Sequence, residues 1–130
     1  MIGIVIVAHG GLAQEYLATM THVVGPQRGV RAVSINTADD RTRKENEICA
    51  TADDVDAGDG VIIVADMFGA SPSNLSLAAC KRAKRRILYG MNLPMLIKLA
   101  KSRNLDVGDA VLRATEAGRK YIDSHNVSSD

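Results

Sequence analysis

Short apolar runs alternate with longer amphipathic stretches along this chain. The runs at residues 2–8, 30–35, 60–65 and 86–90 are rich in aliphatic side chains and predict β-strands. The first and third are almost continuously apolar, which is typical of central strands buried on both faces. The alternation predicts an α/β fold in which helices cover a mainly parallel sheet.

The stretches between the predicted strands have helical periodicity. The first of them carries apolar residues three or four positions apart, at Leu12, Tyr16, Met20 and Val23. This spacing predicts a helix with one apolar face directed at the sheet. Further helices are predicted at residues 40–54, 72–82, 94–101 and 107–122.

Four loops of this arrangement reach one edge of the sheet, at residues 9–11, 36–40, 66–71 and 90–93. Parallel strands place all their carboxyl ends along the same edge, and right-handed crossovers return the chain to it. Ligands of open α/β sheets bind just outside these ends. We therefore expect the functional residues in these four loops.

The bulk properties of the chain indicate one domain over residues 1–130. A hydrophobic content of 46% is ample for a core, and with no Trp, three Tyr and one Phe, aliphatic side chains must supply most of it. A formal charge of +1 provides no field to attract nucleic acid.

No apolar run approaches the roughly 18 residues of a membrane span, so we expect no membrane insertion. The first apolar run is too short for a signal peptide and no basic residues precede it. These features predict a cytoplasmic protein, in which Cys49 and Cys80 are free thiols.

His9 directly follows the first strand, and Gly10 and Gly11 behind it leave the imidazole unscreened. A lone histidine at a strand end is more often structural than catalytic. Asp66, however, occupies the corresponding place after the third strand. A carboxylate that accepts a hydrogen bond from one imidazole nitrogen leaves the other nitrogen free as a nucleophile. Asp66 is equally consistent with a turn former.

The loop that follows has features of an anion site. Ser71 and Pro72 are typical of a helix start, whose unpaired amides and positive dipole end favour an anion. Gly69 and Ala70 leave the backbone accessible to a phosphoryl group, and Ser71 adds a hydroxyl donor.

Two further groups of side chains stand out, an apolar pair and a basic run. Met67 and Phe68 either anchor a docking protein or pin their loop to the core. The basic run consists of Lys81, Arg82, Lys84, Arg85 and Arg86. These five residues are predicted to form a solvated helix end at the opposite edge of the sheet from His9.

Three segments of the chain carry a likeness to a known family. They are residues 7–10 (Val-Ala-His-Gly), 66–74 (Asp-Met-Phe-Gly-Ala-Ser-Pro-Ser-Asn) and 90–96 (Gly-Met-Asn-Leu-Pro-Met-Leu), with a weaker match, Glu-Ala-Gly-Arg, at 116–119. In this order and spacing the sequence resembles the IIA component of the mannose-type bacterial phosphotransferase system. The likeness covers nearly the whole chain.

The resemblance implies that His9 accepts a phosphoryl group from phospho-HPr and that Asp66 orients the His9 ring. It implies that Gly10, Ser71 and nearby amides bind the phosphoryl group, without a metal or cofactor. The implied fold is a three-layer sandwich with strand order 2-1-3-4, plus a C-terminal strand that is often exchanged between the subunits of a homodimer. The phosphoryl group would pass to a IIB component or a regulatory protein.

Two departures from the family pattern affect the expected role. Ala70 replaces a glycine that is common in the motif, and Ser73 replaces the phenylalanine typical of sugar-transporting members. With serine at this position, the chain resembles the free-standing members that serve regulatory phosphorelays more than the sugar transporters. Sugar transport and regulation therefore both stay open.

Two other classes of protein remain as alternatives. Small tetrapyrrole metal chelatases also open with a strand that ends in Ala-His-Gly, but no second histidine is expected near His9 to complete a metal site. A regulatory binding module without phosphotransfer is the other, and the presence of both His9 and Asp66 argues against it. Nucleotide-binding and hydrolase motifs do not occur in the sequence.

Overall fold

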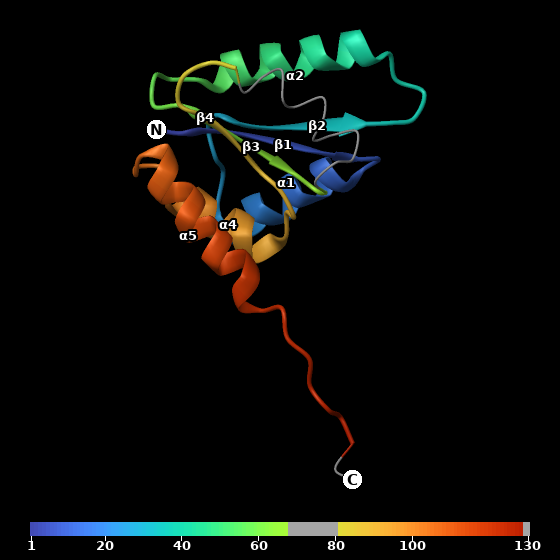
Figure 1. The fold of residues 1–130 in the computed structure, drawn as a ribbon, viewed down its shortest axis with the longest axis vertical. Helices are drawn as coiled ribbons and strands as arrows, with labels where there is room; N and C mark the ends of the chain where they lie inside the picture. The colour runs from blue at the N-terminus through green and yellow to red at the C-terminus, as the bar shows by residue number, and fades with distance from the viewer. Residues whose placement is uncertain (68–80, 129–130) are drawn as a thin grey trace.

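The computed structural model describes residues 1–67 and 81–128, which form a three-layer α/β sandwich (Figure 1). The middle layer is a sheet of parallel strands in the order β2-β1-β3-β4. These strands are β1 (Gly3–His9), β2 (Val30–Ile35), β3 (Val61–Ala65) and β4 (Arg85–Leu88). The predicted fold class and strand order are confirmed.

Helices cover both faces of the sheet (Figure 1). One face is covered by α1 (Leu12–Val24), α4 (Leu93–Lys101) and α5 (Val107–Lys120), and the other by α2 (Arg41–Val55). The predicted helix at residues 72–82 falls almost wholly outside the described residues. No helix among the described residues is long and apolar enough to span a membrane.

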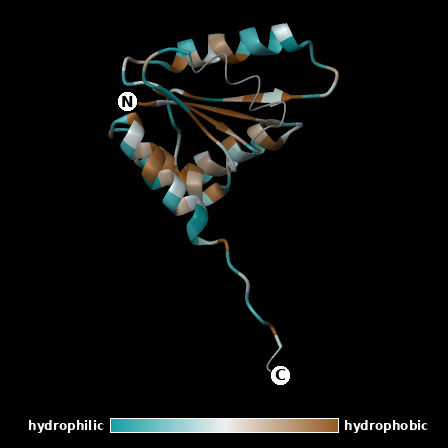
Figure 2. Cartoon of the chain, viewed as in Figure 1, coloured by the Kyte–Doolittle hydropathy of each residue, from teal (hydrophilic) through white to brown (hydrophobic). Residues whose placement is uncertain are grey.

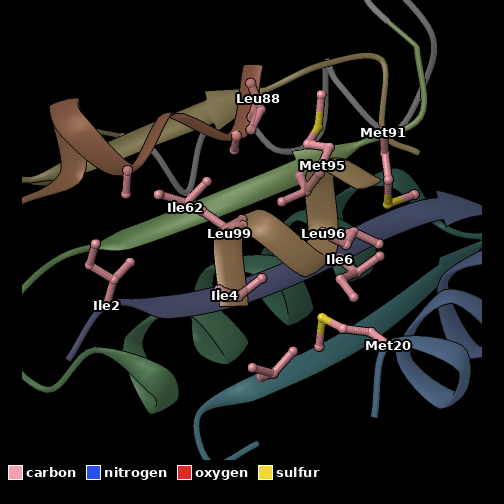
Figure 3. Close-up of a cluster of buried hydrophobic side chains, with 14 of the residues drawn as sticks. Ile2, Ile4, Ile6, Met20, Ile62, Leu88, Met91, Met95, Leu96 and Leu99 are labelled. Carbon is pink, nitrogen blue, oxygen red and sulfur yellow. The ribbon is translucent and has the colours of Figure 1, made fainter. Parts of the chain in front are cut away.

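The two central strands are buried because helices lie on both sides of them. Ile4 and Ile6 of β1 belong to the core beneath α1, α4 and α5, where Ile62 of β3 joins them (Figure 3). Val5 and Val7 alternate with these residues and pack toward α2. Each fully buried aliphatic side chain contributes roughly 1.5–3 kcal/mol to folding. The strands are accordingly the most hydrophobic part of the ribbon in Figure 2.

The strand register brings the ends of β1 and β3 together. Val7 pairs with Ala65, the last residue of β3, while β1 continues to His9 beside Ile35 of β2. Asp66 directly follows Ala65, so it lies beside the last residues of β1. The parallel register therefore places Asp66 next to His9.

The basic run differs from its prediction at Arg85. This residue begins β4, its side chain is only 1% exposed, and its Nη2 lies 2.7 Å from Asp53 Oδ1 and 3.2 Å from Asp56 Oδ2. Because alternate residues of a strand point to opposite faces, Arg85 is directed into the α2 layer rather than into solvent. The predicted solvated helix end is wrong for this residue.

The C-terminal strand implied by the family resemblance is not seen among the residues described after α5. Residues 122–128 are irregular and exposed, and they extend away from the domain (Figure 1). Tyr121 and Ile122 lie at the start of this tail, 68% and 74% exposed.

Candidate functional site

His9 and Asp66 form a hydrogen-bonded pair at the carboxyl edge of the sheet. His9 Nδ1 lies 2.8 Å from Asp66 Oδ2, and the His9 backbone N–H donates to the same oxygen at 3.2 Å. The His9 side chain is 42% exposed, whereas that of Asp66 is 13% exposed. The carboxylate therefore holds the ring from the protein side while the ring itself faces solvent.

The pair determines which ring nitrogen is available for chemistry. Partial burial acts to raise the pKa of Asp66, but the hydrogen bonds from the His9 ring and backbone hold that pKa below its ordinary value of 3.8. An ionised carboxylate can only accept, so Nδ1 carries the proton of the neutral ring. Nε2 then keeps its lone pair, which suits it to attack an electrophile such as phosphorus.

The glycines behind His9 position the start of α1 at the same edge. Gly10 has a φ of +56°, a left-handed conformation that glycine adopts readily, and its N–H donates to Ile35 O at 3.0 Å. Gly11 is the N-cap of α1 and supplies no side-chain hydrogen bond to the first turn. The first amides of α1 are thus open to an anion beside His9. The predicted helix, whose apolar spacing begins at Leu12, thus starts where the structure places α1.

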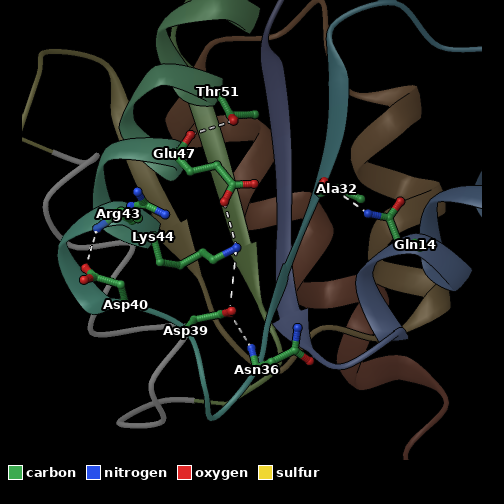
Figure 4. Close-up of polar contacts among 9 residues, drawn as sticks. All are labelled: Gln14, Ala32, Asn36, Asp39, Asp40, Arg43, Lys44, Glu47 and Thr51. Carbon is green, nitrogen blue, oxygen red and sulfur yellow. Dashed lines mark hydrogen bonds and ion pairs between the residues drawn. The ribbon is translucent and has the colours of Figure 1, made fainter.

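A pocket opens beside His9 on the side of the sheet edge that carries β2 and α2. Its other lining residues are Ile35, Asn36, Thr37, Asp39, Arg41 and Lys44. Lys44 Nζ lies 2.7 Å from Glu47 and 3.7 Å from Asp39, and Asp39 accepts from the Asn36 N–H at 2.7 Å (Figure 4). This network holds the loop of residues 36–40 in place next to the imidazole.

The remaining predicted site residues are only partly within the described residues. Met67 is 55% exposed beside Asp66, as a docking residue requires, and Leu12 of α1 is 47% exposed at the same edge. Phe68, Gly69, Ala70 and Ser71 lie outside the described residues.

The fourth edge loop packs against the end of β3. The Met91 N–H donates to Ala65 O at 3.2 Å, directly before Asp66. Asn92 caps α4 by accepting from the Met95 N–H at 3.0 Å and donates to Gly118 O of α5 at 2.8 Å. A Cβ at Gly118 would lie 2.9 Å from Met95 Cε. Two of the segments that carry the family likeness, residues 90–96 and 116–119, therefore meet in one contact.

Metal ligands are sparse around this edge. Within residues 1–67 and 81–128 no group of three or more His, Cys, Asp or Glu side chains could hold a metal ion. At this edge the described residues bring together one exposed imidazole and one carboxylate.

The sequence of the chain is similar to components of the phosphotransferase system. Residues 3–116 match the family model of the PTS system fructose IIA component. The mannose-specific EIIAB component of the phosphotransferase system of Escherichia coli K12 is 28% identical over 124 residues, which cover 93% of this chain and 38% of that protein. The chain therefore spans well under half the length of that relative.

Solved structures share the fold over nearly their full length. Phosphotransferase system component EIIA from Streptococcus agalactiae is 26% identical, with a TM-score of 0.81 and coverage of 95% of this chain and 97% of that one. The mannose/sorbose-specific IIA subunit from Enterococcus faecalis is 24% identical, with a TM-score of 0.85 and coverage of 98% and 97%. The latter likeness shows a common fold.

Proposed function

The chain belongs to the family of fructose IIA components of the phosphotransferase system, and from this premise we propose that it is a phosphocarrier whose phosphoryl acceptor is His9 Nε2. The observation that carries the proposal is the His9–Asp66 pair at the carboxyl edge of the sheet. It provides an exposed imidazole with one nitrogen committed to a carboxylate and the other free.

The proposed transfer needs no change of oxidation state. The Nε2 lone pair forms a bond to phosphorus while the bond from phosphorus to the donor, phospho-HPr, breaks and its electron pair stays with the donor. The Nδ1 proton remains on the ring, held by Asp66, which offsets the positive charge that the imidazole develops on phosphorylation. The reverse steps deliver the phosphoryl group to the next protein.

The open first turn of α1 supports the same proposal. Its uncapped amides and positive dipole end lie next to His9 and favour a dianionic phosphoryl group there. Gly69, Ala70 and Ser71 are proposed to complete the phosphoryl site from the other side, with Met67 and Phe68 in contact with the partner protein.

Membership of this family supports a choice of partner proteins to test. We propose HPr as donor, a IIB-type component or a regulatory protein as acceptor, and a homodimer as the working form. The E. coli relative joins IIA and IIB in one chain by name. A IIB-type acceptor is therefore the first to test.

The proposal is tested by incubating the protein with phosphoenolpyruvate, enzyme I and HPr. We expect one phosphoryl group per chain, labile in acid and stable in base, and its absence in His9→Ala. His22→Ala is the matched control, because His22 is exposed on α1 and should label like wild type. Absence of label in the wild-type protein with its own HPr, or full label in His9→Ala, would refute the proposal.

A further inference from the structure

The outer surface of α4 and α5 carries a groove that the site around His9 does not use. The two helices pack side by side, and Asn92 at the start of α4 contacts Gly118 near the end of α5, so they run antiparallel (Figure 1). The floor of the groove includes the half-buried Pro94, Ile97 and Ala117. Apolar side chains thus lie along the seam between the two helices.

Positive side chains border this groove. Lys98, Lys101, Arg113 and Lys120 are all exposed along it, against the single carboxylate of Glu116. Among the described residues, none of these four cations forms an ion pair with a carboxylate, whereas most cations of the α2 layer do. Lys120 instead lies over the ring of Tyr121, 5.4 Å from its centre. The groove thus has an uncompensated positive charge, although the whole chain is nearly neutral.

We propose that this groove binds an acidic amphipathic helix of a partner protein. A third helix fills the seam between two antiparallel helices, as in a helical bundle. Apolar side chains at positions i, i+4 and i+7 of that helix would contact Ile97 and Ala117, and flanking carboxylates would pair with the four cations.

The shape and charge of the groove favour this occupant over a membrane or a helix of a second copy. Because the apolar residues are recessed between charged walls, a flat lipid surface would meet the cations without reaching the floor. In a second copy, the helix richest in carboxylates is α2, and its buried residues, Ile48, Ala52 and Val55, face its own sheet. That helix has no apolar face to offer.

The groove reaches the edge of the sheet that carries His9. Leu93 lines its upper end and also lines a neighbouring pocket with Leu12 and Tyr16 of α1. A bound helix would therefore end close to the proposed phosphoryl site. Binding itself does not depend on phosphorylation of His9, so the test below stands apart from the test of the proposed function.

The test uses a fluorescein-labelled helical peptide of about 18 residues, built from Leu, Ala and Glu with leucines at i, i+4 and i+7. We expect it to bind the wild-type protein and to shift backbone amide signals confined to residues 93–101 and 113–121. The double variant Lys98→Glu with Arg113→Glu should weaken binding about tenfold or more. Ala117→Trp, which fills the floor, should also weaken it.

The matched control carries the same charge change away from the groove. Arg28→Glu with Arg43→Glu alters two exposed arginines at the opposite sheet edge and on α2, and should change the affinity by less than about twofold. Failure of the wild type to bind, equal weakening by both double variants, or shifts spread over other surfaces would overturn the proposal. It would also be overturned if light scattering showed that the groove variants dissociate a dimer, because a second copy would then cover the groove.

Discussion

A single oxygen atom, Asp66 Oδ2, accepts both the ring and the backbone hydrogen bonds of His9. This arrangement fixes the orientation of the imidazole and its distance from the strand end at the same time. Asp66 is shielded while the ring is exposed. In the proposed transfer, this difference would leave the ring to meet the phosphoryl group and the carboxylate to hold the ring.

Asp66→Asn should slow phosphorylation of His9 by roughly ten- to a hundredfold while leaving the fold intact, since an amide no longer compensates the charge of the ring or enforces one tautomer. Rapid-quench measurement of transfer from phospho-HPr, with circular dichroism for the fold, checks this. A transfer rate equal to wild type would show that Asp66 does not orient the ring.

The lowered pKa of Asp66 also predicts a pH dependence of stability. A carboxyl group whose pKa is lower in the folded than in the unfolded chain stabilises the fold above its unfolded pKa, and this stabilisation is lost as the pH falls through the folded value. The free energy of unfolding should therefore drop below about pH 4. Urea unfolding across this range should show a shallower drop for Asp66→Asn, and identical slopes would contradict the predicted linkage.

For single residues, the sequence predicts a position in the fold when that position follows from the neighbouring residues in the chain. His9 and Asp66 could be identified because each directly follows an apolar run, and parallel strands bring such positions to one edge. Arg85 could not, because its burial depends on Asp53 and Asp56, about thirty residues earlier in the chain. The start of α1 at Leu12 could also be predicted, because the helical spacing of apolar residues begins there.

Between elements, Arg85 joins β4 to the C-terminal end of α2. Burial acts to lower the pKa of Arg85, but its hydrogen bonds to Asp53 and Asp56 raise it above its ordinary value, so the guanidinium stays charged. The two carboxylates are partly exposed while the cation is buried. Removing the arginine and removing the two carboxylates should therefore lower the stability of the fold by different amounts.

Arg85→Met should lower the free energy of unfolding by about 1–2 kcal/mol, because water can hydrate the two carboxylates that remain. Asp53→Asn with Asp56→Asn should cost more, about 3–5 kcal/mol, because a buried charge loses both carboxylates. Chemical denaturation of the two variants checks the order. If Arg85→Met proved the more destabilising, the network would owe its stability to packing of the arginine stem instead.

The contact between α4 and α5 depends on Asn92. Asn92→Ala removes the cap of α4 and the hydrogen bond to Gly118, and should lower the free energy of unfolding by about 1–3 kcal/mol. Asn104→Ala is a suitable control, since Asn104 is exposed in the loop before α5. Equal stability of the two variants in urea would show that the Asn92 contacts are not stabilising.

At the scale of whole elements, the hydrophobic pattern predicted most boundaries, since each core strand is an apolar run and each helix a periodic one. The start of β4 is an exception, because an arginine paired inside the protein looks like a solvent-exposed residue in the sequence. The end of α5 is another, because the predicted helix extends to Ile122 whereas α5 ends at Lys120.

For the molecule as a whole, β4 is the outermost strand of the described sheet and the C-terminal tail is exposed, with Ile122 and Val127 uncovered. Such features suit strand exchange with a second copy. Light scattering should show a dimer for the full chain and a monomer after deletion of residues 122–130. A monomeric full chain, or an unchanged dimer after the deletion, would contradict exchange through the tail.

The central claim is that His9 Nε2 carries the phosphoryl group, and the state of the ring nitrogens tests it most directly. The protein is labelled with ¹⁵N-histidine, phosphorylated with phosphoenolpyruvate, enzyme I and HPr, and examined by heteronuclear NMR for coupling between phosphorus and nitrogen. We predict coupling to Nε2 of His9, with Nδ1 still protonated beside Asp66. Phosphorus bonded to Nδ1, or to any residue other than His9, would contradict the account.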